Sequence, residues 1–466
     1  MLSQKINQDI FLEVLSYIST QEEVFPPNNA INKSTSNILL SLALTCRAFL
    51  EPSLDKLWVR LDDLHPLFRL LPTFQPGIDG VWFLESPILD LHWETLQEYA
   101  KRIQTLVYLD EGAPIDPSVF FAVSQYADRK ANQRLLPSLR QLFTIMPFTD
   151  NHGTYRSMWS FVDALAEQAP GMHSAFLHFA LPSKSFNAVA KMRNLTQLTI
   201  MQNGSTPSQV NAASFVVLSS MKALTHLRLD GLVLSDHLMP LTNPRAVSFS
   251  ALKTPEISAS MPEIVPLFQA AKLPALQVLK IKLVPPILEE PHQDWWGFCR
   301  ELKLSTKSQL PELVIKPGHF PFDFRPHLEG LPMVIPDILA FNFIKLDLQE
   351  YKLFRSFSDD DIRDFARAWP NIEELHLPTQ IPSKLTFTAF VDIAKQMRNL
   401  KQLTLNFILR KDDSLSLESV NTTGSGFQHP LHHLNGLNST FVADNTDALT
   451  LGACLHALFP NLTLWT

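Results

Sequence analysis

The segment Met192-Arg193-Asn194-Leu195-Thr196-Gln197-Leu198-Thr199-Ile200 decides how this chain folds, because its spacing of apolar residues recurs along the sequence. Leu195, Leu198 and Ile200 follow the pattern Leu-x-x-Leu-x-Leu, and Met192 adds an apolar residue three positions earlier. Leu198 and Ile200 alternate on a short strand, so their side chains point to the same face. Leu195 closes the turn that precedes this strand.

Further copies of the pattern run to the end of the chain. Strong copies begin at Met221, Leu273, Trp369 and Met397, and weaker ones at Ile103, Leu139, Met172, Leu252, Leu310, Phe343, Leu431 and Leu462. The leading residues Leu195, Leu224, Leu252 and Leu276 are separated by 29, 28 and 24 residues, and Ile372 and Leu400 by 28. Such steps fit a leucine-rich repeat of about 20–29 residues. Scattered leucines in an ordinary α/β domain are the alternative, and the recurring apolar lead-in argues against it.

Between the expected strands lie amphipathic helical stretches. Residues 359–369 place Ile362, Phe365 and Trp369 on one stripe, with Ser358 or Asp359 as the N-cap, and residues 387–397 repeat the design. One unit cannot bury its inward face alone, whereas stacked units share a continuous core. Residues 63–466 are therefore expected to form an α/β leucine-rich-repeat solenoid, a horseshoe.

The first sixty residues differ in pattern. Residues 6–18 are expected to be helical, with a polar loop at 21–37, a second apolar run at 38–49 and a short helix after Pro52. Three short helices have too few neighbours to bury all of this aliphatic surface among themselves. Part of it should dock on another chain or on the following domain.

These pieces resemble the F-box of fungal F-box proteins that carry C-terminal leucine-rich repeats. The resemblance rests on Ile6-x-x-Asp9-Ile10-x-x-Glu13-Val14-Leu15, on Thr45-Cys46-Arg47-Ala48-Phe49 and on Leu57-Trp58. Ile6-Asn7 stands where that family has Leu-Pro, and residues 92–103 resemble the first repeat helix and strand of such proteins.

The resemblance implies an all-helical F-box-like module at residues 1–62 that docks on a Skp-type adaptor and, through it, on a cullin. The implied adaptor contacts are Ile6, Ile10, Val14, Leu15, Leu40, Leu44, Arg47 and Trp58. Trp58 has a second reading, in which it packs the junction to the next domain. The alternative for the whole segment is a helical cap that covers the end of a non-ligase repeat scaffold.

Composition narrows the class of protein. The chain has 466 residues, 45% of them hydrophobic, and a net charge of −7 without a basic stripe, which argues against a disordered chain and against nucleic acid as a partner. Its three cysteines are far apart, which is typical of a reducing compartment. The longest apolar stretch, 38–46, is too short to span a bilayer, and no signal peptide is recognised. We therefore expect a cytoplasmic or nuclear protein that does not contact membranes.

No catalytic motif stands out, so neither an enzymatic activity nor a cofactor is expected. His429, His432 and His433 cluster near Pro430 without an acidic or Cys partner at metal spacing. His432 and His433 fall inside the Leu431 repeat and read as surface residues, and Asp359, Asp360 and Asp361 read as the start of a helix.

Binding has a natural place on the concave face, where strand residues between the inward leucines point. Those residues are Gln197, Thr199, His226, Arg228, Val278, Lys280, Lys345, Asp347, Glu374, His376, Gln402 and Thr404, with a basic bias between Arg228 and Lys280. A ligand on the loops is the alternative. The resemblance implies the substrate-recognition subunit of an SCF-type cullin-RING ubiquitin ligase that binds a protein substrate. A repeat scaffold or a receptor for a small ligand remains open.

Overall fold

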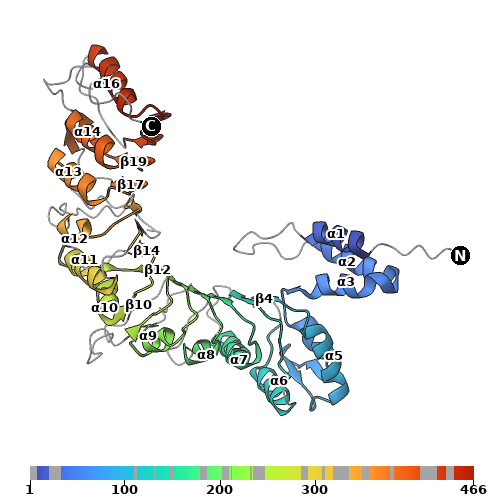
Figure 1. The fold of residues 1–466 in the computed structure, drawn as a ribbon. Helices are drawn as coiled ribbons and strands as arrows, with labels where there is room; N and C mark the ends of the chain where they lie inside the picture. The colour runs from blue at the N-terminus through green and yellow to red at the C-terminus, as the bar shows by residue number, and fades with distance from the viewer. Residues whose placement is uncertain are drawn as a thin grey trace. The chain divides into compact units, whose positions relative to one another are not determined.

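The computed structural model describes residues 8–19, 33–109, 113–130, 133–145, 152–178, 186–201, 209–210, 212–230, 233–234, 247–284, 292–306, 310–317, 335–348, 356–377, 383–409, 428–436 and 445–465. The chain divides into two compact units, Met1–Ser208 and Gln209–Thr466. In both units parallel strands carry helices on one face (Figure 1). Within the described ranges, no helix is both long and apolar enough to cross a membrane.

The first unit begins with a helical module made of α1 (Gln8–Ser19), α2 (Lys33–Thr45) and α3 (Arg47–Trp58). Phe11, Leu15 and Leu39 form its core, and Leu42, Phe49 and Leu57 pack against them. All six residues belong to the module, so the three helices share a small core of their own.

Two of the expected helix boundaries in this module were wrong. Helix α2 begins at Lys33, inside the stretch expected to be a loop, and α3 begins at Arg47 rather than after Pro52. Pro52 lies within α3, where it removes one backbone donor from the helix. The helix continues through it because Phe49 and Leu57, on either side of Pro52, are both held against the module core.

The rest of the first unit alternates strands with helices. Its parallel sheet has the order β1 (Arg60–Leu61), β4 (Thr105–Leu109), β5 (Gln141–Ile145), β6 (Ser174–His178) and β7 (Gln197–Met201). The helices are α4 (His65–Phe68), α5 (Asp90–Ala100), α6 (Pro117–Arg129), α7 (His152–Gln168) and α8 (Phe186–Lys191). Strands β2 (Phe74–Pro76) and β3 (Trp82–Leu84) form an antiparallel hairpin beside them.

The second unit continues the same design. Its parallel sheet has the order β9 (His226–Asp230), β12 (Thr254–Ala259), β14 (Val278–Leu283), β15 (Glu312–Pro317), β16 (Lys345–Asp347), β17 (Glu374–Leu377), β19 (Gln402–Leu405), β21 (His433–Asn435) and β22 (Leu464–Trp465). The helices are α9 (Ala212–Ser219), α10 (Met261–Ala270), α11 (His292–Thr306), α12 (Ile335–Leu339), α13 (Asp359–Ala368), α14 (Phe387–Gln396) and α16 (Asn445–Leu458). Short parallel pairs join β8 (Gln209–Val210) to β10 (Val233–Leu234), β11 (Val247–Ser248) to β13 (Ala271–Lys272), and β18 (Ser383–Leu385) to β20 (Phe407–Leu409).

A ladder of leucines runs through the core of the second unit. The strand register pairs equivalent leucines of successive repeats, in the order Leu279, Leu313, Leu346, Leu375, Leu403 and Leu434. All six are buried. Leucines that recur once per repeat in the sequence therefore lie side by side in the sheet. Every strong and weak copy of the pattern has a strand at the expected place.

Most described repeats are also tied to their predecessors by backbone hydrogen bonds at the start of the strand. The amides of Gln104 and Thr105 both donate to Val59 O at 2.9 Å, and those of Gln277 and Val278 donate to Lys253 O at 2.9 and 3.0 Å. The same two-to-one contact recurs before β5, β6, β7, β12, β16, β17, β19 and β21. It places these strands in the same register, so equivalent side chains form rows across the sheet.

The expected repeat helices were confirmed. Helix α13 is capped by Ser358, which accepts a hydrogen bond from Asp361 N while Asp361 accepts from Ser358 N at 2.8 Å. Ile362, Phe365 and Trp369 are buried beneath it, as are Phe390, Ile393 and Met397 beneath α14.

Candidate protein-binding surfaces

The helical module presents apolar side chains that its own core does not cover. Leu40 and Leu44 lie one turn apart on α2 and are 48% and 78% exposed. On α1, Val14 and Tyr17 are also exposed, at 48% and 71%. Exposed aliphatic groups in this density are typical of a surface that docks on another protein.

The remaining residues expected at this surface fall in different places. Ile6 and the side chain of Ile10 lie outside the described residues. Leu15 is fully buried in the module core, because it faces Leu39. Its assignment as an adaptor contact is therefore corrected to a core position. Arg47 is exposed at the start of α3.

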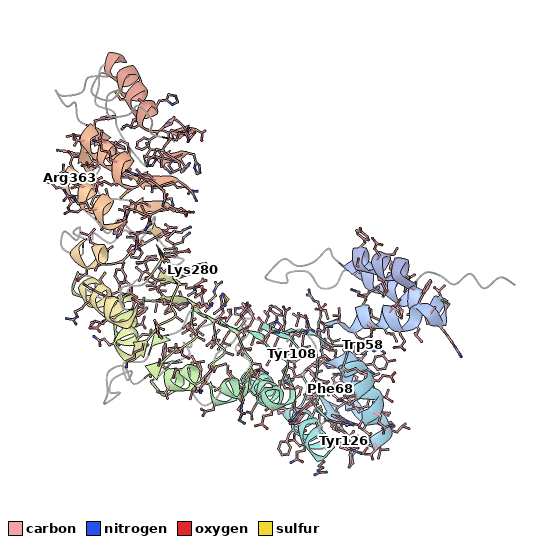
Figure 2. The ribbon with its side chains drawn as sticks, in the orientation of Figure 1. Trp58, Phe68, Tyr108, Tyr126, Lys280 and Arg363 are labelled. Atoms are coloured by element: carbon pink, nitrogen blue, oxygen red, sulfur yellow. The ribbon has the colours of Figure 1, made fainter. Side chains whose placement is uncertain are left out.

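Trp58 lies at the end of α3 and joins the module to the first repeat helix. Its ring packs on Tyr99 of α5 with ring centroids 4.7 Å apart. Figure 2 labels Trp58 at this position. This contact agrees with the second reading of Trp58, in which its side chain packs the junction between the module and the repeats. Sequence reasoning missed three further exposed residues of the module, Leu12, Tyr17 and Ile38. The spacing of apolar residues predicts a helix, but it does not predict which of these residues are buried inside the module.

In the second unit, the strand residues between the leucines form rows on the sheet face away from the helices, here called the helix-free face. One row, by register, is Arg228, Glu256, Lys280, Val314, Asp347, His376, Thr404 and Asn435. A second row includes Val278, Glu312, Lys345, Glu374, Gln402 and His433, with His226 opposite Thr254. The expected binding residues of this unit are therefore brought onto one face.

Four charged residues of β9, β12 and β14 form a closed ion-pair cluster on this face. Arg228 Nη2 contacts Asp230 Oδ2 at 3.1 Å and Arg228 Nε approaches Glu256 Oε1 at 3.4 Å. Lys282 Nζ lies 3.4 Å from Asp230 Oδ2 and 3.3 Å from Glu256 Oε1. Burial alone would raise the pKa of Asp230, but the hydrogen bond from Arg228 and the charges of Lys282 and Arg228 outweigh it and lower that pKa. Arg228 is therefore neutralised within the sheet and does not carry the basic bias expected from the sequence.

Towards β19 the helix-free face becomes buried. Asp347, His376 and Thr404 are at most 5% exposed, and His376 Nδ1 lies 2.8 Å from Thr404 Oγ1. Burial lowers the pKa of His376 against the opposing pull of Asp347 and Glu374. These three residues were expected to line an accessible surface, and the structure instead buries them. Lys345 and Glu374 remain half-buried, with Lys345 Nζ 2.5 Å from Glu374 Oε2.

The helix-free face of the first unit carries an apolar row beside a polar one. Val107, Phe143 and Phe176 face one another in register and form a buried cluster, with Thr199 at the next position of the row. Gln197 is exposed and Thr199 is half-buried. The signal for this cluster was present in the sequence, because β4, β5 and β6 carry apolar residues at both alternating positions.

Sequence reasoning also missed Asp230, Glu256, Lys282 and Lys316 on the second unit. Lys282 and Lys316 lie in strands that extend two residues past the Leu-x-x-Leu-x-Leu pattern. Glu256 lies inside the weak copy of the pattern that begins at Leu252, and strand alternation there could have found it.

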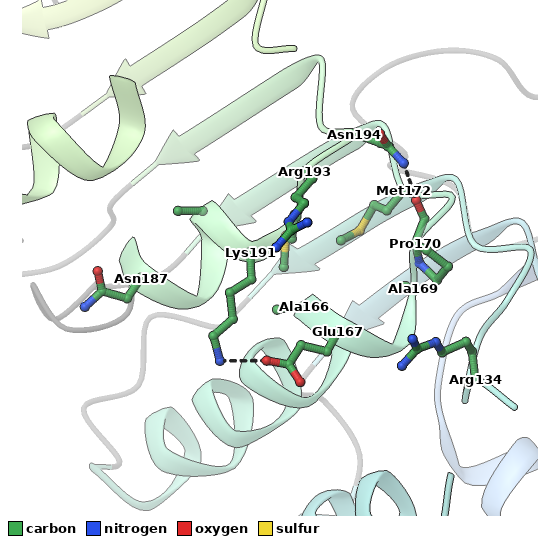
Figure 3. A pocket seen from close by; sticks show the side chains of 12 residues that line it. Arg134, Ala166, Glu167, Ala169, Pro170, Met172, Asn187, Lys191, Arg193 and Asn194 are labelled. Atoms are coloured by element: carbon green, nitrogen blue, oxygen red, sulfur yellow. Dashed lines mark hydrogen bonds and ion pairs between the residues drawn. The ribbon is translucent and has the colours of Figure 1, made fainter. Parts of the chain in front are cut away.

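A cavity of about 620 Å³ opens on the first unit where α7 and α8 turn into their following strands. Alanines, Pro170, Met172 and Met192 line it together with the charged residues Arg134, Lys191 and Arg193. Figure 3 shows the side chains that line this cavity. Lys191 pairs with Glu167 at 3.0 Å. Lys191 lies in the last turn of α8, where the helix dipole favours a cation, so its charge needs no ligand to explain it.

The candidate metal groups weighed from the sequence have other partners. Asp359 accepts from Thr386 N at 2.9 Å, Asp360 pairs with Arg363, and Asp361 belongs to the cap of α13. Across the described part of the chain, no three His, Cys, Asp or Glu side chains gather as metal ligands would.

No family model matches this sequence, and no curated protein matches it. Among solved structures, an internalin from Listeria monocytogenes has a TM-score of 0.38 and 11% identity, over 87% of this chain and 97% of that one. A leucine-rich-repeat protein from Leptospira interrogans has a TM-score of 0.35 and 12% identity, over 87% and 99%. A protein from Bacteroides fragilis has a TM-score of 0.32 and 13% identity, over 63% and 71%.

At these identities and TM-scores the similarity carries no argument about this chain. The fold is assigned from its own leucine ladder and strand order. On that ground, the chain is an α/β solenoid of leucine-rich repeats.

Proposed function

We propose that this chain is the substrate-recognition subunit of an SCF-type cullin-RING ubiquitin ligase. Helices α1–α3 dock on a Skp-type adaptor, which links the chain to a cullin, and the repeats bind a protein substrate. The chain works in the cytoplasm or nucleus and carries no catalytic residue. It raises the local concentration of substrate lysines near a separately supplied ubiquitin thioester.

The observation that carries the proposal is the uncovered apolar surface of a module that already has its own core. Phe11, Leu15 and Leu39 are buried within the module, whereas Leu40 and Leu44 are exposed. A helical cap would direct its apolar stripe at the repeats, but α1 directs Phe11 and Leu15 at α2 and α3. The motif Thr45-Cys46-Arg47-Ala48-Phe49 at the α2–α3 turn adds the resemblance to an F-box.

A capture experiment with a purified Skp-type adaptor tests the proposal. The wild-type chain is compared with a Leu40→Asp/Leu44→Asp variant and with Leu304→Asp, which changes a leucine of α11 that is also 48% exposed. Each buried leucine contributes about 1.5–3 kcal/mol, and an unpaired buried carboxylate costs more. We expect the wild type and Leu304→Asp to bind and the double variant not to bind.

Circular dichroism shows whether all three proteins are folded. Failure of the folded wild type to bind the adaptor would overturn the ligase assignment and favour the repeat scaffold. Equal binding by the folded double variant would show that α2 is not the docking surface.

A further inference from the structure

Three lysines lie close together on the helix-free face of the second unit. Lys280 and Lys282 belong to β14, and Lys316 of β15 lies directly opposite Lys282 in register. Figure 2 shows Lys280 on this part of the sheet. These three residues are called the lysine cluster below.

The cluster places like charges where a sheet normally avoids them. Two cations directly opposite each other on neighbouring strands destabilise the pair. Lys282 shares Asp230 and Glu256 with Arg228, and Lys316 Nζ is 3.9 Å from Asp347 Oδ2. No carboxylate of the described residues is within ion-pair distance of Lys280. The cluster is thus only partly neutralised by the protein.

The acids near the cluster are also recessed, whereas Lys280 and Lys316 are exposed and the side chain of Lys282 is 34% exposed. The side chains of Asp230, Glu256 and Asp347 are 22%, 23% and 8% exposed, and that of Lys316 is 49% exposed. Lys280 is exposed as well. An approaching partner therefore meets ammonium groups before it meets carboxylates.

Spacing indicates the kind of anion. Lys280 and Lys282 are two residues apart on a strand, about 6.7 Å, which is also the two-residue repeat of an extended peptide. Carboxylates at every second position of such a peptide can face both lysines, and a third can reach Lys316 on the next strand, about 4.8 Å away. Val314, opposite Lys280, gives an apolar floor for a small residue between the acids.

We infer that the lysine cluster binds an extended, carboxylate-rich segment of a protein partner, with acidic residues at alternate positions. The inference rests on the proposed function, because this segment would be how a substrate is recognised. Carboxylates suit the cluster better than phosphates do, because the cluster offers ammonium groups and no free guanidinium fork. Arg228, whose fork would suit a phosphate, is already held by Asp230 and Glu256.

Fluorescence anisotropy with the full chain tests this binding. The probe is a fluorescein-labelled peptide, Gly-Asp-Ser-Asp-Ser-Asp-Gly. The comparison peptides replace every Asp by Asn, group the three Asp in one block, or carry phosphoserine between Asn residues. We compare the wild type with Lys280→Glu/Lys316→Glu and with the control Lys222→Glu/Lys272→Glu, which changes two exposed lysines outside the cluster.

The alternating Asp peptide should bind the wild type and the control equally, and the cluster variant about tenfold more weakly or worse. Its affinity should fall as ionic strength rises from about 0.05 to about 0.3 M. Absence of binding to the wild type, equal binding of the Asn peptide, or unchanged binding by the folded cluster variant would overturn the inference. Tighter binding of the phosphoserine peptide would assign the cluster to a phosphate instead.

Adaptor capture is measured on the same preparations. A chain that captures the adaptor but ignores the Asp peptide refutes the lysine cluster alone. A chain that binds the peptide but not the adaptor refutes the ligase assignment and leaves the cluster as a peptide site of a scaffold.

Discussion

Arg102 Nη2 donates a hydrogen bond to Glu51 Oε2 at 2.6 Å, and this contact ties the first repeat to helix α3 of the helical module. The same guanidinium contacts Asp55, one turn further along α3. The Arg102 side chain is only 6% exposed, whereas Glu51 and Asp55 are more than half exposed. Burial alone would lower the pKa of Arg102, but the hydrogen bond to Glu51 and the charges of Asp55 and Glu51 raise it.

This asymmetry predicts which partner matters more for stability. In Arg102→Met both carboxylates return to water, so we expect a loss of about 1 kcal/mol in the free energy of unfolding. In Glu51→Gln/Asp55→Asn the guanidinium stays buried without a charged partner, and the expected loss is about 2–4 kcal/mol. Urea unfolding measures both, with Lys401→Met, which removes an exposed pair with Glu373, as a control near zero. A larger loss in Arg102→Met than in Glu51→Gln/Asp55→Asn would show that other groups solvate the buried guanidinium.

The leucine ladder predicts a sharp contrast between neighbouring residues of β14. Leu279→Ala removes a fully buried side chain that lies opposite Leu313, and should cost about 2–5 kcal/mol. Lys280→Ala changes an exposed residue next to it and should alter stability by less than about 0.5 kcal/mol. Thermal and urea unfolding distinguish the two variants. Similar losses in both would mean that the strand register differs from the one described.

His429 should make the stability of the second unit depend on pH. Its Nε2 faces Met397 O at 2.9 Å and its Nδ1 accepts from Leu431 N at 3.2 Å, which requires the neutral ring. Burial lowers the pKa of His429 below 6.5, against a smaller raising effect of the Met397 hydrogen bond.

The direction of this effect follows from proton binding. The unfolded chain protonates His429 near pH 6.5 and the folded chain only at lower pH, so the unfolded state holds more protons in that interval. The contribution of His429 to the free energy of unfolding should therefore be fully present above pH 6.5 and should decrease as the pH falls below 6.5. His429→Gln should flatten this part of a stability-versus-pH curve, whereas His432→Gln, at an exposed site, should leave it unchanged. An unaltered slope in His429→Gln would assign the acid sensitivity to other groups.

At Trp369, we expect loss of the aromatic ring to reduce stability much more than loss of the indole N–H alone. Its ring stacks on Phe365 with centroids 5.0 Å apart and meets Phe343 at 5.7 Å, while its Nε1 has no hydrogen-bond partner among the described residues. Trp369→Ala should cost about 3–5 kcal/mol. Trp369→Phe keeps an aromatic ring and removes the unsatisfied donor, so its change should stay within about 1 kcal/mol. A loss of similar size in both variants would reveal a partner for Nε1.

Much of the repeat fold was predictable from local pattern. The spacing in Leu195-Thr196-Gln197-Leu198-Thr199-Ile200 and its copies located the strands, because inward residues must alternate and must recur once per repeat. The cap at Ser358 and the stripes of α13 and α14 were likewise visible, since capping and helical spacing are local chemistry. The start of α3 was not, because its course through Pro52 depends on packing against the rest of the module.

Only the tertiary structure decided which apolar side chains of the helical module are exposed and which charged side chains of the sheet lack an ion-pair partner. Leu15 and Leu44 have the same chemistry in the sequence, but the fold buries the first and leaves the second 78% exposed. Arg228 and Lys280 both suggested a basic face, yet Arg228 is neutralised by Asp230 and Glu256. The sequence by itself determined the repeat, because a repeat is a one-dimensional property. The surfaces depended on the register between strands, which brings together residues that lie about 25 positions or more apart along the chain.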